Sequence, residues 1–142
     1  MARKTFDDDV TDLIQALGLL IRRARAAGGA HELSLTEAAV MGRLLRDGPA
    51  TTADLARAES MKPQSMGSTI AALESSGMVE RRPHPTDGRQ MLIALTAKGA
   101  AVRKSSGDAK RTWLVQAMSQ LDERERDTLF AAGRIIRRLV EE

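Results

Sequence analysis

The stretch RRPHPTDGRQMLIALT, residues 81–96, most constrains what the chain can fold into, because it interrupts an otherwise helical pattern. Its two prolines lack a backbone N–H, and the Asp-Gly pair after them favours a turn. An apolar run follows the turn. We therefore predict a β-hairpin with strands at about 78–82 and 90–95 and a polar tip over 83–88. Arginines border this tip on both sides: Arg81, Arg82 and Arg89.

The residues before the hairpin have helical periodicity. Over residues 10–21, apolar side chains recur at steps of three and four, with three aspartates before them and arginines after them, which predicts a helix. A second helix is predicted with Thr36 as its N-cap, ending at the Asp-Gly-Pro that follows it. Thr51 caps a short third helix. The fourth has Lys62 near its cap and Pro63 in its first turn, where a missing N–H costs nothing.

Two more helices are predicted after the hairpin. Thr96 reads as the N-cap of a long helix that extends to about Gln120. Gly107 lies in its polar middle, so this helix is either continuous or broken there. Asp122, with Glu125 three residues later, is the capping-box pattern that opens a last helix. The fold class is therefore mainly α with a small antiparallel β-hairpin.

Composition narrows the possible functions. At 142 residues the chain has the length of one ordinary domain, and with 2% aromatic residues its core must be aliphatic. The absence of cysteine excludes disulfides, thiolate metal sites and cysteine nucleophiles. The two histidines, His31 and His84, are far apart in sequence, so we expect no metal and no cofactor, and a solvated His31. The chain has neither a membrane-length apolar run nor a secretory signal, so we expect a cytoplasmic protein without a membrane partner.

The third and fourth predicted helices form a helix-turn-helix pattern. Such a pair places its second helix in the DNA major groove. If the apolar stripe of the fourth helix points inward, its outward face presents Gln64, Ser65 and Ser68, which can hydrogen-bond to base edges. Lys62 and the unpaired N–H groups of the first turn suit a phosphate. The alternative is an ordinary solvated helix face.

A hairpin directly after a helix-turn-helix is typical of a wing that reaches the neighbouring minor groove. A guanidinium is attracted there by the concentrated negative potential, which suits Arg89. Asp87, two residues earlier, is positioned to orient this arginine by a bidentate pair. The alternative is a simple Asp-Gly turn followed by a solubilising charge. His84 is close enough to the tip to contact a phosphate, although a surface loop position is the simpler interpretation.

These residues resemble a known family. The stretch DGRQMLIALTAKG, residues 87–99, has an Asp, an Arg two residues later, a Leu-Thr pair and a Gly three residues after the Thr. This pattern resembles the signature of the MarR family of bacterial transcriptional regulators. The stretches GPATTADLA and LESSGMVERRPHPTDGR are also similar to that family. The resemblance extends over nearly the whole chain.

The resemblance implies a winged-helix homodimer that binds a palindromic operator in double-stranded DNA. The winged helix-turn-helix would be residues 33–96, and residues 1–32 and 97–142 would form the dimer. Residues implied or inferred to contact DNA are Thr51, Lys62, Gln64, Ser65, Ser68, Arg81, Arg82, Asp87 and Arg89. Residues expected in the dimer interface are Leu13, Leu17, Trp113, Leu121, Leu129, Ile136 and Leu139. Many members release DNA when a small organic effector binds.

The sequence departs from the family pattern at three positions. Ser68 and Ala72 are small and neutral where members often have Arg or Lys, so Arg57, Arg81 and Arg82 must supply more of the phosphate attraction. Gly88 stands where another Arg is common. Without cysteine, thiol-based peroxide sensing is excluded, and without tyrosine a ligand pocket has few aromatic walls. The effector therefore has no assigned identity.

The leading functional hypothesis is a sequence-specific DNA-binding transcriptional regulator, a homodimeric repressor that a small molecule releases. The alternative is a winged-helix module for protein interactions with little DNA affinity, suggested by the neutral fourth helix. An enzyme is not expected, because the sequence has no nucleophile–base arrangement, metal cluster or glycine-rich phosphate loop.

Overall fold

The computed structural model describes residues 2–29 and 33–141, so His31 lies outside the described residues. The chain forms two compact units. One unit consists of residues 1–28 and 108–142, and the other of residues 29–107. The two ends of the chain are therefore grouped together, and the middle of the chain folds separately. In the described part, no helix is both long and apolar enough to cross a membrane.

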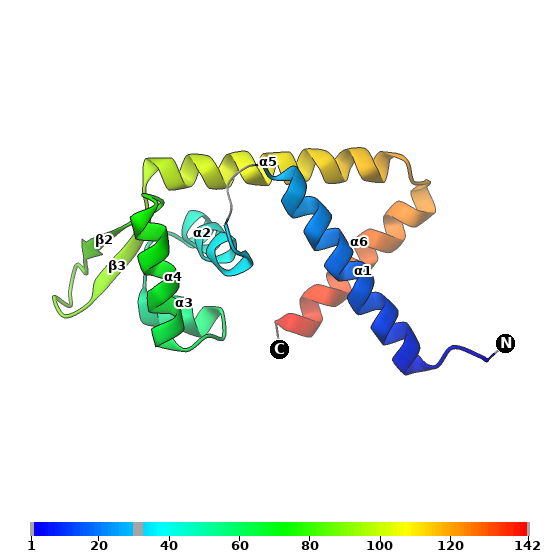
Figure 1. Ribbon diagram of the computed structural model, residues 1–142, viewed down its shortest axis with the longest axis horizontal. Helices are drawn as coiled ribbons and strands as arrows, with labels where there is room; N and C mark the ends of the chain where they lie inside the picture. The colour runs from blue at the N-terminus through cyan, green and yellow to red at the C-terminus, as the bar shows by residue number, and fades with distance from the viewer. Residues whose placement is uncertain (1, 30–32, 142) are drawn as a thin grey trace. The chain divides into compact units, whose positions relative to one another are not determined.

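The terminal unit is helical (Figure 1). It contains α1, Phe6–Ala27, and α6, Glu123–Val140. Asp122 caps α6 and forms the predicted capping box with Glu125. α1 begins earlier than predicted, because Thr5 forms a capping box with Asp8 and brings the aspartates into the first turn.

Helix α5, Ala97–Ser119, is continuous through Gly107, which decides the question that the sequence left open. A glycine costs a helix interior only about 1 kcal/mol relative to alanine, which a helix of this length tolerates. The predicted cap at Thr96 is confirmed, since its hydroxyl oxygen accepts a hydrogen bond from the Gly99 N–H at 3.0 Å.

The middle unit combines α2, α3, α4 and the first part of α5 with a small sheet (Figure 1). The bounds of the helices before the hairpin are α2, Leu35–Asp47; α3, Thr52–Ala58; and α4, Pro63–Ser75. The strands are β1, Ala50–Thr51; β2, Val79–Pro83; and β3, Met91–Leu95. The sheet is antiparallel in the order β1-β3-β2, so the predicted hairpin of β2 and β3 is confirmed. Strand β1, which pairs with β3 in the register Ala50↔Ile93, was not predicted.

The predicted N-cap of α2 was wrong. The cap is Ser34, whose Oγ accepts from the Glu37 N–H at 3.0 Å, while Glu37 Oε1 accepts from the Ser34 N–H at 3.1 Å. Thr36 lies within the first turn. Ser34 prevails because the reciprocal capping box satisfies two backbone donors, one more than a single side-chain cap does.

The core lies in the middle unit and is aliphatic. Helices α2, α3 and α4 contribute to it with strands β2 and β3, and its largest fully buried side chains are Met41, Leu55, Met66, Ile70, Leu73, Ile93 and Val40. By contrast, neither α1 nor α6 has a buried residue. The middle unit thus has its own core, whereas the apolar faces of the terminal helices stay open.

Candidate nucleic-acid interface

Helices α3 and α4 form the predicted helix-turn-helix. Glu59 ends α3 and Lys62 caps α4, so the connection is short. Ser60 has a positive φ of 52°, and the Met61 N–H donates back to the Ala56 carbonyl oxygen at 2.8 Å. This tight reversal lets the two helices pack against each other and leaves the outer face of α4 open.

The outer face of α4 is small, polar and uncharged. The apolar stripe of Met66, Ile70 and Leu73 has no exposed surface, as predicted, and Gln64, Ser65 and Ser68 are exposed. The Ser68 hydroxyl donates to the Gln64 carbonyl oxygen at 3.3 Å, which leaves the oxygen lone pairs available outward. The three side chains predicted to read base edges therefore share one accessible face.

The N-terminus of α4 is open to an anion. Lys62 is the N-cap and makes no side-chain capping hydrogen bond, and Pro63 occupies the first turn, as predicted. The first-turn N–H groups of a helix have no partner within the helix, and the helix dipole adds positive potential there. The exposed Lys62 adds a full positive charge at the same end.

Thr51, unlike most of the residues predicted to contact DNA, is nearly buried. It is 9% exposed, and its Oγ1 accepts from the Asp54 N–H at 3.1 Å, which confirms that it caps α3. The DNA contact assigned to Thr51 stays a prediction. The hydrogen bond with Thr51 and the ion pair with Arg57 lower the pKa of Asp54 below its ordinary value. Arg57 therefore has part of its charge offset within α3.

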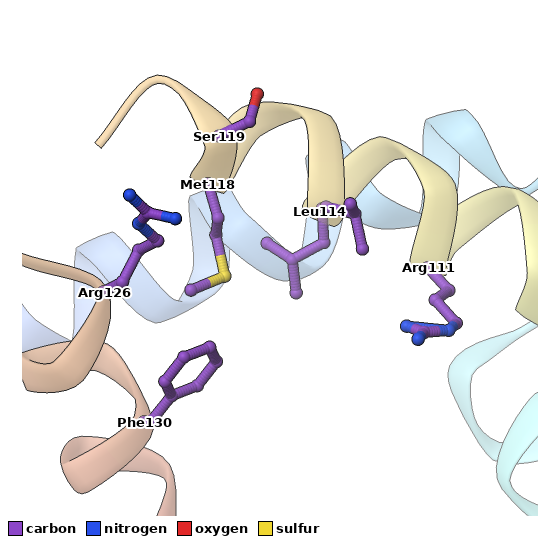
Figure 2. A pocket seen from close by; sticks show the side chains of 7 residues that line it. Arg111, Leu114, Met118, Ser119, Arg126 and Phe130 are labelled. Carbon is purple, nitrogen blue, oxygen red and sulfur yellow. The ribbon is translucent and has the colours of Figure 1, made fainter. Parts of the chain in front are cut away.

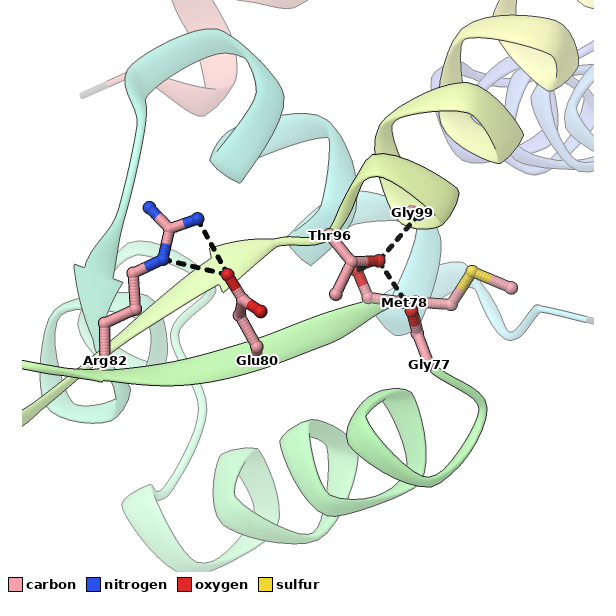
Figure 3. A network of polar contacts seen from close by, with 6 residues as sticks. All are labelled: Gly77, Met78, Glu80, Arg82, Thr96 and Gly99. Carbon is pink, nitrogen blue, oxygen red and sulfur yellow. Dashed lines mark hydrogen bonds and ion pairs between the residues drawn. The ribbon is translucent and has the colours of Figure 1, made fainter.

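The two arginines at the base of the wing are paired with carboxylates. Arg81 Nε lies 3.1 Å from Glu74 Oε2. Arg82 donates from Nε and Nη2 to Glu80 Oε1 at 2.9 and 2.7 Å (Figure 3). All four side chains are substantially exposed, and exposed ion pairs are worth at most about 1 kcal/mol. These arginines can therefore exchange a carboxylate for a phosphate at little cost.

The tip of the wing differs from the prediction in one contact. Asp87 does not form a bidentate pair with the Arg89 side chain; its Oδ1 accepts from the Arg89 backbone N–H at 3.0 Å. An aspartate commonly bonds the backbone two residues ahead in a turn, because its short side chain reaches that N–H without bending. Among the described residues, no carboxylate forms an ion pair with the exposed Arg89 guanidinium. Asp87 thus holds the backbone at Arg89 and leaves the guanidinium available.

The His84 ring also holds the tip, which the sequence did not reveal. Its Nδ1 accepts from the backbone N–H groups of Thr86 at 3.2 Å and Asp87 at 3.1 Å. The sequence places His84 near the turn, but the loop conformation decides whether its ring faces the backbone. The alternative role of His84, a contact with a phosphate, stays untested.

The base of the wing is joined to the first turn of α5 (Figure 3). Thr96 Oγ1 donates to the Gly77 carbonyl oxygen at 2.6 Å, and the Thr96 N–H donates to the Met78 carbonyl oxygen at 3.0 Å. Gly99 lies so close that a Cβ there would be 2.0 Å from the Met78 oxygen. The Thr and the Gly of the signature, Thr96 and Gly99, are therefore the residues that permit this close approach.

The terminal unit exposes large apolar side chains. Leu13, Leu129 and Leu139 are 54%, 48% and 73% exposed. The other candidates for the dimer interface, Leu17, Trp113, Leu121 and Ile136, are half-buried or lie at the border of exposure. These positions fit an interface, and their assignment stays a prediction.

A hollow of about 530 Å³ lies between α5 and α6 in the same unit. Leu114, Met118 and Phe130 form apolar walls, and Arg111 and Arg126 lie at its edges (Figure 2). Its apolar walls and two guanidinium groups are the chemistry that an organic anion requires.

Comparisons with known proteins agree with this architecture. The model of the MarR family matches residues 33–91. An uncharacterised HTH-type transcriptional regulator of Mycobacterium bovis is 35% identical over 132 residues, 93% of this chain and 92% of that protein. An HTH-type transcriptional repressor of the same organism is 29% identical over 110 residues, 77% of this chain and 79% of that protein.

A solved structure has the same fold. The crystal structure of Rv1404 from Mycobacterium tuberculosis superposes with a TM-score of 0.84 and 24% identity, covering 100% of this chain and 99% of that one. The helix-turn-helix, the arginine-edged wing, the matching family model and the full-length relative lead to one conclusion: the chain belongs to the MarR family of transcriptional regulators, and its middle unit is the DNA-binding winged helix.

Proposed function

We propose that this regulator is a homodimeric repressor that binds a palindromic operator and releases it when a small organic effector binds. One observation carries the proposal: the exposed face of α4 and the exposed guanidinium of Arg89, which forms no ion pair within residues 2–29 and 33–141, belong to the same folded unit. That unit therefore offers one element for the major groove and one for the adjacent minor groove.

In the proposed complex, α4 reads the major groove. Gln64 is suited to a bidentate contact with adenine, and Ser65 and Ser68 to donate to or accept from several base edges. Lys62 and the open first turn of α4 bind a phosphate and set the depth of the helix. Because the face carries no charge beyond Lys62, base contacts supply a larger share of the affinity there.

The wing contributes most of the charge. Arg89 enters the minor groove, and Arg81 and Arg82 exchange their glutamates for phosphates along the backbone. Support for this exchange comes from the exposure of both ion pairs. Each phosphate that an arginine neutralises releases counterions, so binding weakens as salt rises.

The terminal helices form the proposed dimer. Most of the large exposed apolar side chains of the described residues lie on α1, α5 and α6. A surface of this kind is expected to find a partner, and a two-fold dimer covers the same patch on both chains. Two-fold symmetry then presents two α4 helices about 34 Å apart, one turn of DNA, so the operator proposed for this dimer is palindromic.

Repression and effector release complete the proposal. Repression is supported by the similarity to a protein named as a transcriptional repressor. Effector release is supported by the hollow between α5 and α6, whose chemistry suits a small organic anion. An aromatic carboxylate is therefore the first class of effector to add to the preformed complex.

A DNA titration at two salt concentrations tests the proposal. The protein is titrated against its own upstream intergenic DNA and an unrelated fragment of equal length. Tight, salt-sensitive binding to the cognate fragment alone is the expected result. Equal weak binding to both fragments contradicts an operator at this site and leads back to a winged helix that contacts other proteins.

A further inference from the structure

The tip of the wing is ordered by a side chain that the DNA-binding proposal does not use. Two successive N–H groups, of Thr86 and Asp87, converge on His84 Nδ1 at 3.2 and 3.1 Å. The His84 N–H donates to the Gln90 carbonyl oxygen at 3.3 Å, and the Gln90 N–H donates to the Asp87 carbonyl oxygen at 3.1 Å. The His84 ring therefore stabilises the loop conformation by accepting hydrogen bonds from the loop's own backbone.

A chain of hydrogen bonds connects the His84 ring with the Arg89 backbone through Asp87. The ring holds the Asp87 N–H, and the Asp87 carboxylate holds the Arg89 N–H at 3.0 Å. Each contact fixes the backbone on which the next depends. Because Nδ1 accepts both hydrogen bonds, it carries no proton, and in the neutral ring the proton lies on Nε2.

We propose that His84 is a positioning residue: its Nδ1 orders the wing tip so that the Arg89 backbone is preset for DNA. This inference rests on the proposed function. Ordering the tip before binding lowers the conformational entropy lost when Arg89 enters the groove. The competing role is a direct contact between the ring and a phosphate.

Three substitutions separate these two roles. His84→Asn keeps an acceptor, because Asn Oδ1 is bonded to Cγ as Nδ1 is, and it cannot become a cation. His84→Ala removes the acceptor. His84→Lys removes the acceptor and adds a cation. If His84 positions the tip, His84→Asn should bind DNA with nearly the wild-type affinity. If His84 contacts a phosphate, His84→Lys should do so instead.

The first test needs no DNA. Amide hydrogen exchange of Thr86 and Asp87 is measured by NMR in the three variants and the wild type. We expect exchange about five- to tenfold faster in His84→Ala and His84→Lys, as the loss of one hydrogen bond predicts, and unchanged in His84→Asn. Unchanged exchange in His84→Ala, or ring nitrogen shifts that place the proton on Nδ1, would overturn the proposal.

The second test is a double-mutant cycle on DNA. His84→Ala should weaken operator binding about five- to tenfold when Arg89 is present and add no loss in Arg89→Ala, while His84→Asn binds as the wild type does. Additive losses, or strong binding by His84→Lys, would overturn positioning in favour of a phosphate contact.

The two tests distinguish a failure of the proposed function from a failure of the role assigned to His84. If the wild-type protein binds no DNA, the proposed function and the DNA role of His84 both fall. Amide exchange would then still decide whether the ring orders the tip.

Discussion

The arginines of the wing differ in what surrounds them. Arg81 and Arg82 form ion pairs with glutamates. The Arg89 backbone N–H is held by Asp87, and its exposed guanidinium forms no ion pair among the described residues. Of the three, Arg89 is therefore the one whose charge is available to DNA without breaking an existing pair.

Arg89→Ala should weaken operator binding by about 1–3 kcal/mol, because a desolvated groove contact is lost. Arg82→Ala is the matched control. Its loss should be smaller, since Arg82 must give up Glu80 before it binds a phosphate. Fluorescence anisotropy at constant salt measures both. Equal affinities of the Arg89 variant and the wild type would remove Arg89 from the interface.

Gly88→Arg should strengthen DNA binding. Nothing lies within 4 Å of a Cβ at Gly88, and its φ is outside the left-handed region, so the wing accepts the side chain without strain. One more phosphate contact should steepen the salt dependence by about one unit on a log–log plot. A variant with unaltered affinity and slope would show that this side of the tip faces away from DNA.

Gly99→Ala should destabilise the middle unit by about 3 kcal/mol or more. Its Cβ would overlap the Met78 carbonyl oxygen, and the backbone on both sides must move. The control is Gly67→Ala, where nothing lies within 4 Å and a helix interior gains about 1 kcal/mol. Denaturant unfolding compares them. Similar stabilities would contradict the close approach between the wing base and α5.

The helices and strands that could be predicted are those whose sequence signals lie within a few consecutive residues. Thr51, Lys62 and Asp122 were found as caps because a cap depends on three or four consecutive residues. β1 was not found, because two residues give no alternation and its partner strand is some forty residues away. The contacts of His84 and Asp87 with the wing backbone also escaped prediction, since they depend on the loop conformation rather than on residue type.

The N-terminus of α1 should loosen in acid. The hydrogen bonds with Thr5 lower the pKa of Asp8 below its ordinary value of 3.8. A lowered pKa in the folded state stabilises the helix end above the unfolded pKa, and this contribution is lost as pH falls through the folded pKa. NMR of the Thr5 and Asp8 amides between pH 5 and 2 follows the loss. Asp8→Asn should show no such transition, and an identical transition there would assign it to another group.

At the scale of the whole molecule, the exposed apolar side chains of α1 and α6 belong to the interface of the proposed dimer. Leu139→Glu should dissociate the proposed dimer and weaken operator binding, because a charge would be buried in an apolar interface. Leu139 is 73% exposed in the single chain, so the fold itself should survive. Leu35→Glu, at a leucine 55% exposed on α2, is the control. Analytical ultracentrifugation reports the mass; a dimeric Leu139 variant would place the interface elsewhere.

The uncharged face of α4 also affects how this protein finds its operator in a chromosome. Attraction to arbitrary DNA is almost wholly electrostatic. A regulator whose reading helix has a cation only at its N-cap, Lys62, is held less tightly by random sequence than one with basic side chains along that helix. It should therefore spend little time on the excess of competing sites, so a small number of molecules in the cell can keep one operator occupied.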